Sequence, residues 1–422
     1  MKFTKTKIGY LVLGMMLLVL LLVESRGIGD LDIFISASKD LLAGGNIYDI
    51  KYHTHYYYFY DVLFALIISP LQFIPLFWAN FIWLLFNVFF TYRIWKIILF
   101  YLPVDKLRKE QVRLLTVISF AFIFALWHKN IHLTQMTIFI LYLCLEGIHL
   151  IKNEHPLAGS TLLGIGISIK ILPIVIIPYL LYRGYFKASI YSILATGIIL
   201  CCPALIFGQE HLMFLLQERW NLINPLNTEH ILDITERSFH SLTSLLSILL
   251  VENARGEFSL DLKRNIANVD LKTLSLIINI VRFCLIASVL FFIRALPFKR
   301  SSSKVQFLYE FSYILLITPL IFPHQQHYAF FFVFPAITYL VFYLILKYGE
   351  SLKSKKGLLN KWPLLALMLG IFFLLNSHFI LGAYRTIYDH FKTLSYGVLL
   401  LIPLLALVRP HRIDLLIREI NE

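Results

Sequence analysis

The sequence predicts an all-α polytopic membrane protein, on the strength of its composition, its repeated apolar runs and the placement of its charges. Of the 422 residues, 59% are apolar and 15% are charged, whereas charged residues average about 25% in soluble proteins. One membrane-spanning helix takes about 20 apolar residues, and apolar runs recur along the whole chain. These proportions exclude a disordered chain, a collagen-like rod, a coiled coil and an ordinary soluble enzyme.

The basic residues are distributed as in membrane proteins. The chain has 38 Lys and Arg against 25 Asp and Glu, a net charge of +13. The cations stand in short clusters between apolar runs, which is typical of cytoplasmic loops under the positive-inside rule. We therefore expect this charge to face the membrane surface and no nucleic acid. Four cysteines fall inside apolar runs and are predicted to be small core residues: Cys144, Cys201, Cys202 and Cys284.

Placing every strongly basic loop on one side predicts about twelve spans with both chain ends in the cytoplasm. The predicted spans are 8–23, 76–99, 114–127, 133–151, two short spans within 156–183, 188–205, 274–293, 307–322, 328–346, 364–381 and 394–408. The run 62–74 is short and contains Pro70, so we predict a re-entrant or interfacial helix there. Lys170 and Pro173 interrupt the run 156–183, and this predicts a hinge near the outer surface.

The chain is predicted to form one transmembrane domain over residues 1–422, with two long extracytoplasmic loops, 24–75 and 207–272. Each loop contains an apolar segment that suits a helix lying along the membrane, 31–43 in the first and 242–251 in the second. The two loops are not alike, whereas transporters built from repeats more often show matching halves.

Two carboxylates stand where the first loop helix is expected to begin. Asp30 and Asp32 precede the apolar pattern, which ends at Gly44-Gly45. One interpretation is that either carboxylate caps the helix by accepting a backbone N–H. The other is a general base at the membrane–water boundary, which takes a proton from a sugar or lipid hydroxyl. Capping and catalysis are compatible.

Lys170 is a second candidate, because a lysine within apolar spans needs an anionic partner or an aqueous cavity. It could bind a phosphate electrostatically, or its side chain could simply extend to the interface.

Two histidines share a polar segment between two predicted spans. His324 and His327 are three residues apart and would share one face of a helix. Zinc would need a third ligand, and none is indicated. The pair is therefore interpreted either as interfacial polar residues or as phosphate and sugar contacts.

The remaining candidates lie in or beside the loops. Tyr60 ends an aromatic segment that suits either a belt at the headgroup level or stacking on sugar rings. Gln135 stands at the outer start of a span, where a helix-start hydrogen bond is the simpler interpretation. Arg237 and His240 lie in the second long loop, where arginine suits phosphate but a solvated loop is as good an interpretation.

The order of these residues resembles glycosyltransferase family 87, the polyprenol-phosphate-mannose-dependent mannosyltransferases of the GT-C fold. The resemblance rests on Asp30 with its helix to Tyr48, on Gln135, on the stretch 168–173, and on Thr318-Pro319 with the histidines downstream.

The resemblance covers roughly residues 30–335 and implies a GT-C-like bundle of about 12 transmembrane helices with interfacial helices in the extracytoplasmic loops. The family's usual Tyr-Pro-Pro element reads Tyr60-Asp61-Val62 here. The implied reaction transfers a sugar, with inversion, from a lipid monophosphate to a lipid or glycan hydroxyl.

The resemblance also implies roles for the candidate residues. Asp30 is the expected catalytic base; Lys170, His324 and Arg237 are expected at the donor phosphate; and Asp32, Tyr60, Gln135, His327 and His240 are expected at the acceptor or sugar. No nucleotide, metal or other cofactor is expected, because the donor is a polyprenyl-phosphate sugar.

Two other functions stay open at this point. The chain could be a transporter or flippase of a lipid-linked saccharide, or a polymerase or ligase that uses a lipid-diphosphate donor. In each case we expect an integral protein of a bacterial inner membrane, with its active site on the extracytoplasmic side.

Overall fold

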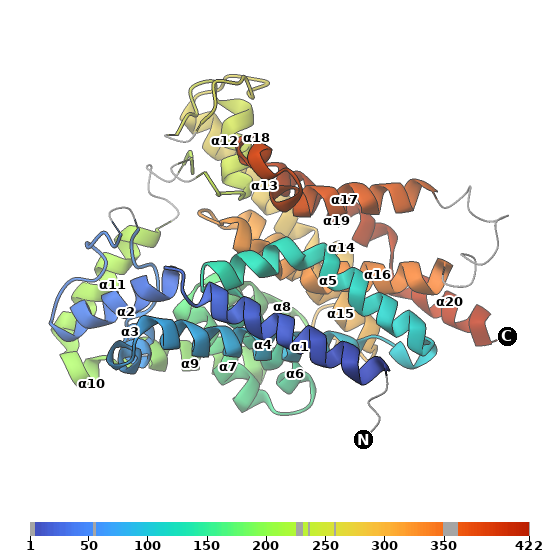
Figure 1. Ribbon diagram of the computed structural model, residues 1–422, viewed down its shortest axis with the longest axis horizontal. Helices are drawn as coiled ribbons and strands as arrows, with labels where there is room; N and C mark the ends of the chain where they lie inside the picture. The colour runs from blue at the N-terminus through green and yellow to red at the C-terminus, as the bar shows by residue number, and fades with distance from the viewer. Residues whose placement is uncertain are drawn as a thin grey trace. The chain divides into compact units, whose positions relative to one another are not determined.

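The computed structural model describes residues 5–53, 56–224, 231–234, 237–256, 259–348 and 362–421. This described part is all-helical, as the sequence predicts, and Figure 1 shows the helices along the chain. Within it, extended pairing is limited to two isolated bridges, Tyr52 with Tyr56 and Phe239 with Gln326.

The elements follow the apolar runs of the sequence. The first half comprises α1 (Lys5–Glu24), α2 (Asp30–Leu42), α3 (Val62–Ile68), η1 (Ser69–Phe73), α4 (Leu76–Tyr101), η2 (Val104–Lys106), α5 (Lys109–His132), α6 (Thr137–Lys152), α7 (Pro156–Ile169), η3 (Leu172–Val175), α8 (Ile176–Tyr182), α9 (Phe186–Cys201), α10 (Ala204–Phe207) and α11 (Gln209–Ile223). The second half comprises α12 (Leu242–Leu250), α13 (Leu271–Ala287), α14 (Val289–Ile293), α15 (Lys304–Ile321), η5 (His327–Val333), α16 (Phe334–Tyr348), α17 (Trp362–Ile380), η9 (Gly382–Tyr384), α18 (Arg385–His390), α19 (Thr393–Leu407) and α20 (Pro410–Asn421).

Seven helical stretches of the described chain are long and apolar enough to cross a membrane. An eighth is formed if the pair 382–390 and 393–407, bent by 69°, counts as one span. The other four predicted spans lie on α1, α6, α7 and α8 with η3. The helices α6, α7 and α8 with η3 are shorter than a full span, and the described apolar part of α1 is Leu11–Glu24. The chain is therefore an integral membrane protein, while the count of about twelve spans is not confirmed.

The predicted interruptions and loop helices are present. Lys170 follows α7 in extended conformation (φ −143°, ψ 126°), so the helix ends there as predicted. Helices are present where they are expected at 31–43 and 242–251, as α2 and α12, and their position along the membrane stays a prediction. The sequence did not predict α11, which occupies the start of the second long loop.

The chain divides into two compact units. Unit 1 comprises Met1–Ile94, His128–Ile171 and Tyr191–Ile223, and unit 2 comprises Trp95–Trp127, Leu172–Ile190 and Asn224–Glu422. The predicted single transmembrane domain stays a prediction, and each unit is described separately.

Close backbone contact and the ion pair of Arg93 with Glu146 both stabilise unit 1. A Cβ on Gly159 would lie 2.2 Å from the carbonyl oxygen of Gly147, so α6 and α7 pack at glycine distance. Arg93 on α4 donates to both carboxylate oxygens of Glu146 on α6 at 2.8 Å. Figure 1 shows α2, α3 and α11 together at one end of this unit.

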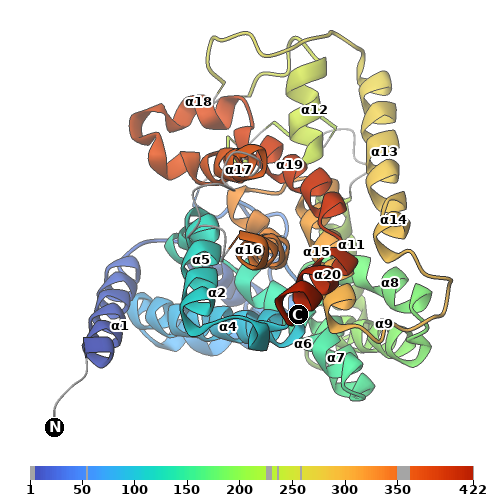
Figure 2. The same ribbon diagram turned by 90° about the vertical axis from the view of Figure 1, so that its right-hand side faces the viewer.

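Unit 2 is built on α15 and on η5 with α16, whose side chains are nearly all buried. Figure 2 shows α12, α17, α18 and α19 together at one end of this unit. At the start of α15, Glu310 accepts hydrogen bonds from Tyr179 and Arg183 of the α8 segment. A buried carboxylate needs such partners, and here they join α8 to α15.

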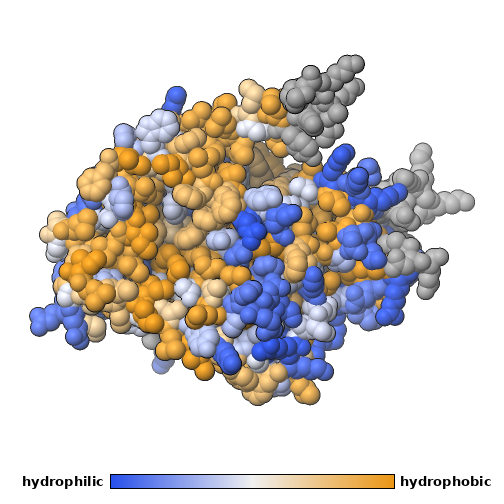
Figure 3. Space-filling model, turned by 90° about the horizontal axis from the view of Figure 1, so that it is seen from below, coloured by the Kyte–Doolittle hydropathy of each residue, from blue (hydrophilic) through white to orange (hydrophobic). Residues whose placement is uncertain are grey.

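The outer helices expose apolar side chains. On α13, Leu276, Ile280 and Phe283 are all exposed, and apolar side chains (orange) cover much of the face seen in Figure 3. Apolar surface of this extent marks a membrane or partner contact, which agrees with the candidate spans.

Candidate active site

The start of α2 is fixed on the turn between α5 and α6. The Asp30 N–H donates to the carbonyl oxygen of Leu133 at 2.9 Å, and the Leu31 N–H donates to Thr134 Oγ1 at 3.1 Å. A Cβ on Gly29 would lie 2.4 Å from Thr134 Oγ1 and 2.8 Å from the Leu133 carbonyl. Only glycine allows this approach, so the position of Asp30 is set by the backbone.

The link from α1 to α2 is anchored as well. Asn80 Nδ2 on α4 donates to the carbonyl oxygens of Ser25 at 3.2 Å and Gly27 at 3.0 Å. At the end of α1, the Glu24 carboxylate lies 2.8 Å from His132 Nδ1 and 3.4 Å from His128 Nε2. The backbone entering α2 therefore has side-chain contacts from both α4 and α5.

The Asp30 carboxylate faces Gln135, whose Nε2 donates to Asp30 Oδ2. Gln135 is buried, and its own N–H donates to the Asn130 carbonyl oxygen at 2.9 Å. Gly29 is the N-cap of α2, so neither Asp30 nor Asp32 occupies the capping position that the simpler interpretation gave them. The Asp30 carboxylate is oriented by a side chain from 105 residues further along the chain.

Lys170 and Tyr60 belong to the same group in unit 1. Burial lowers the pKa of Lys170 to about 8, although the negative charge of Asp30 acts against this shift. Tyr60 is buried with its ring centroid 4.7 Å from that of Phe34 on α2. Burial, followed by the charge of Asp30, raises the pKa of Tyr60 above its ordinary value. Both side chains therefore sense the Asp30 carboxylate electrostatically.

Asp32 is engaged differently. Its Oδ2 lies 2.8 Å from His53 Nε2, with the two side chains 25% and 37% exposed. The structure thus joins Asp32 to the segment after α2, where His53 takes a positive φ of 47°.

A buried ion pair that the sequence analysis missed lies beside this group. Asp61 caps α3 by accepting from the Leu63 N–H, and its carboxylate lies 3.4 Å from Arg219 Nη1 on α11. Arg219 Nη2 also donates to the carbonyl oxygens of Ser168 at 2.8 Å and Ile169 at 3.3 Å. Burial raises the pKa of Asp61 to about 6, against the opposing charge of Arg219.

In unit 2, two distant segments run side by side. The His240 N–H donates to the Gln325 carbonyl oxygen at 2.9 Å, and the His327 N–H donates to the Ser238 carbonyl oxygen at 3.1 Å. This pairing brings together four of the predicted residues: Arg237, His240, His324 and His327.

Asp233 organises one side of that cluster. Its buried carboxylate accepts from Ser241 Oγ at 2.5 Å and Ser244 Oγ at 2.7 Å, and it lies 2.6 Å from His324 Nδ1. Burial alone would raise the pKa of Asp233, but the bonds from His324 and the two serines outweigh it and lower the pKa. The carboxylate contact fixes which nitrogen of the His324 ring carries its proton.

His240 occupies the other side, fully buried and 3.5 Å from Asp389 Oδ1 through Nε2. Burial lowers the pKa of His240 to about 4, although the Asp389 carboxylate acts in the opposite direction. His240 is therefore neutral at physiological pH. Asp389 also pairs with Arg237, whose Nε lies 3.0 Å from Oδ2.

The side chains define what each group can do chemically. Unit 1 presents a carboxylate with an amide donor and an ammonium group; unit 2 presents histidines and an arginine around buried carboxylates. Across the described chain, no three His, Cys, Asp or Glu side chains converge as a metal site.

Comparison with known proteins identifies the family. A sequence model of glycosyltransferase family 87 matches residues 58–302, more than half of the chain. The chain belongs to glycosyltransferase family 87. It is therefore a membrane glycosyltransferase. No curated protein and no solved structure matches the chain.

The family 87 match divides the predicted residues. Tyr60, Gln135, Lys170, Arg237 and His240 lie inside the matched range. The remaining four lie outside it: Asp30, Asp32, His324 and His327.

Several residues of this glycosyltransferase had weak signals in the sequence. Asp61 was visible only as an acid before an apolar run, and Asp233 as one acid among several in the second loop. Asp389 and Lys392 stand between two apolar helices. A polar residue at such a break is the signal that would have singled them out.

Proposed function

We propose that this membrane glycosyltransferase transfers a hexose, mannose by the family resemblance, from a polyprenyl monophosphate to a hydroxyl of a lipid or glycan. The reaction inverts the anomeric centre and takes place on the extracytoplasmic side of a bacterial inner membrane, with both chain ends in the cytoplasm. The reaction requires no nucleotide, because the lipid phosphate is the leaving group.

The orientation of Asp30 carries this proposal. The carboxylate is fixed by Gln135 at the start of α2, on the segment predicted to lie at the membrane surface. Asp30 takes the proton of the acceptor hydroxyl, the hydroxyl oxygen bonds to the anomeric carbon, and the bond from that carbon to the phosphate oxygen breaks on the opposite side.

The leaving phosphate is anionic, so it needs cations more than a proton donor. With a pKa of about 8, Lys170 keeps its charge at neutral pH, and its electrostatic contact with Asp30 supports a place beside the reacting atoms. Arg237 and His324 are the proposed further phosphate contacts. Asp32, Tyr60, Gln135, His240 and His327 are the proposed contacts to sugar or acceptor.

The experiment is sugar transfer by the purified full-length chain in nanodiscs, with radiolabelled polyprenyl-phosphate-mannose as donor and a crude lipid extract as acceptor. We expect Asp30→Asn to bind the donor normally and to lose at least a hundredfold in turnover, because general base catalysis contributes about 10²–10⁴. Asp49→Asn is the matched control, since Asp49 is an exposed carboxylate of the same loop.

The alternatives give different results in the same assay. Near-normal turnover of Asp30→Asn would remove Asp30 as the base. Transfer only from a lipid diphosphate would favour a polymerase or ligase. Movement of the lipid-linked saccharide across vesicles without any transfer would favour a flippase.

A further inference from the structure

The loop after α12 lines a cavity to which the proposed reaction assigns no residue. The cavity has a volume of about 220 Å³ and is lined by residues of 252–265 together with His390. Arg255, Lys263 and Arg264 line it together with the carboxylate of Glu252. Arg255 also pairs with the exposed Asp261, whose Oδ1 lies 3.2 Å from Arg255 Nη1. We call it the basic cavity.

Arg264 is the fixed cation of the basic cavity. Its Nη1 donates to the His390 carbonyl oxygen at 3.0 Å, and its Nη2 donates to Ser259 Oγ at 3.2 Å and to the Ala254 carbonyl oxygen. These partners are neutral, so they orient the guanidinium without cancelling its charge.

His390, the last residue of α18, forms hydrogen bonds with the loop. Its Nδ1 accepts from the Leu260 N–H at 3.1 Å, and its Nε2 lies 3.0 Å from the Leu262 carbonyl oxygen. A ring that accepts at Nδ1 and donates at Nε2 is the neutral tautomer. The wall of the basic cavity is therefore held by hydrogen bonds that require no protonation of His390.

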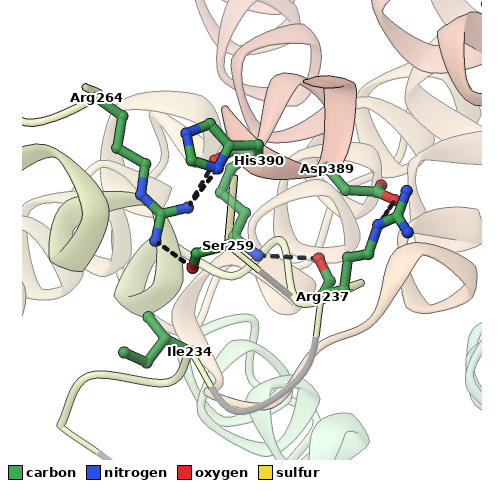
Figure 4. A pocket seen from close by; sticks show the side chains of 7 residues that line it. Ile234, Arg237, Ser259, Arg264, Asp389 and His390 are labelled. Carbon is green, nitrogen blue, oxygen red and sulfur yellow. Dashed lines mark hydrogen bonds and ion pairs between the residues drawn. The ribbon is translucent and has the colours of Figure 1, made fainter. Parts of the chain in front are cut away.

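Two more cations stand behind this wall. Arg264 and His390 also line a water-sized pocket with Arg237 and Lys392, seen from close by in Figure 4. Lys392 is only 4% exposed and donates from Nζ to the Arg237 carbonyl oxygen at 3.0 Å. Asp389 is the one carboxylate lining this pocket, against three cations. Arg237 and Arg264 are partly exposed, and Arg237 pairs with Asp389, so Lys392 is the buried cation of this pocket. The net positive charge of the lining favours a bound anion.

We propose that the basic cavity binds a phosphate group carried by the acceptor. Guanidinium and ammonium groups are the usual protein ligands of phosphate, and a fixed arginine can bind it through two hydrogen bonds. A cavity for one water needs only about 10–15 Å³, so this one has room for a phosphate together with part of its headgroup. The acceptor assignment rests on the proposed function, whereas phosphate binding can be tested without transfer.

The test uses the full-length Asp30→Asn protein in detergent without donor, so that binding is measured in the absence of turnover. The probes are dioctanoyl phosphatidylinositol, neutral dioctanoylglycerol and inorganic phosphate. We expect the phosphorylated lipid to bind and the neutral lipid not to bind. Arg255→Gln/Lys263→Gln, which changes two exposed side chains, should bind the phosphorylated lipid about tenfold more weakly.

Lys272→Gln is the matched control, because Lys272 is exposed at the start of α13 outside the cavity, and its binding should be unchanged. Raising the salt concentration should weaken the binding of the phosphorylated lipid more in the protein that retains Arg255 and Lys263 than in the double variant. Arg264→Gln is a further variant, but it also removes the hydrogen bonds by which Arg264 holds the loop. The test of phosphate binding therefore rests on the double variant.

Three results would overturn parts of the proposal. Equal affinity of the double variant, or equal binding of the neutral lipid, rejects the phosphate site. Competition by inorganic phosphate at the same concentration as the lipid rejects the acceptor as its source. If lipid binding depends on the cavity cations but the unmodified protein transfers no sugar, the phosphate site is supported and the proposed function is rejected.

Discussion

At the scale of single residues, Gln135 is a positioning residue for Asp30. Its amide donates to Asp30 Oδ2 from a buried place on the α5–α6 turn. Gln135→Leu keeps the volume but removes the donor, so the Asp30 carboxylate loses its fixed orientation. We expect kcat to fall about a hundredfold, because misplacing a reacting group by about 1 Å costs this much.

A merely structural role of Gln135 would not change the pH profile. A hydrogen bond to the ionised carboxylate favours the charged form, so its loss should move the acid limb of kcat/KM to higher pH. An unmoved acid limb would contradict the positioning role even if kcat fell.

His240 gives a residue-scale prediction for pH. Its pKa is about 4 in the folded protein and about 6.5 in the unfolded chain. The unfolded chain therefore binds more protons between these values, and the free energy of unfolding must fall as the pH falls through this window. At about 1.4 kcal/mol for each pH unit, the loss from His240 is about 3 kcal/mol.

Thermal unfolding in detergent from pH 7 to pH 4 measures this loss. The free energy of unfolding of His240→Gln does not depend on protonation of residue 240. The difference between the free energies of unfolding of the unmodified protein and His240→Gln should therefore become smaller as the pH falls. Titrating groups away from His240, Asp61 among them, are common to both proteins and cancel. The pKa of Asp389 is lowered by its contact with His240, so Asp389→Asn and the double variant His240→Gln/Asp389→Asn are compared in the same way. A difference that stays constant with pH would show that His240 titrates normally.

At the scale of elements, Arg219 joins three of them. It bonds the last two carbonyls of α7, just before Lys170, and contacts Asp61 at the start of α3. Removing one partner of a buried pair leaves an uncompensated charge, which costs about 3–5 kcal/mol. We expect this loss from Arg219→Met, measured by denaturant unfolding of the detergent-solubilised protein.

The Asp61→Asn/Arg219→Met protein should be more stable than the sum of the single losses indicates, since it leaves no buried charge unpaired. A coupling of about 0.5–3 kcal/mol is typical of residues in contact. Glu210→Gln, an exposed change on the same α11, serves as control. Additive losses would show that Arg219 and Asp61 act separately.

The elements were more predictable than their contacts. Apolar runs and helix breakers predict the ends of α2, α7 and α12, because these signals are local. The single helix predicted over 62–74 is instead α3 followed by η1. The helix α11 mixes polar and apolar residues, so the apolar pattern predicts a loop there. The bond of Gln135 to Asp30 joins residues 105 apart, and no local pattern contains such a distance. The contact between Asp233 and His324 also joins residues far apart in the sequence. The sequence therefore identifies candidate residues but does not predict which of them contact one another.

At the scale of the whole molecule, the number of membrane crossings decides on which side each loop lies. Two exposed sites test it, Asp105 on η2 and Asn253 in the second long loop. Five predicted spans separate them, which places them on opposite sides. Counting only the helices that are long enough leaves two, 109–132 and 186–207, and places both sites on one side.

The three exposed cysteines, Cys201, Cys202 and Cys284, are first replaced by serine, and Asp105→Cys and Asn253→Cys are then made singly. A membrane-impermeant maleimide should label Asn253→Cys in right-side-out vesicles and Asp105→Cys only in inside-out vesicles. Labelling of both from one side would show that an odd number of the shorter helices α6, α7 and α8 do not cross, because each omitted crossing reverses the side. The extracytoplasmic placement of the second loop, and of Arg237 and the basic cavity with it, depends on this result.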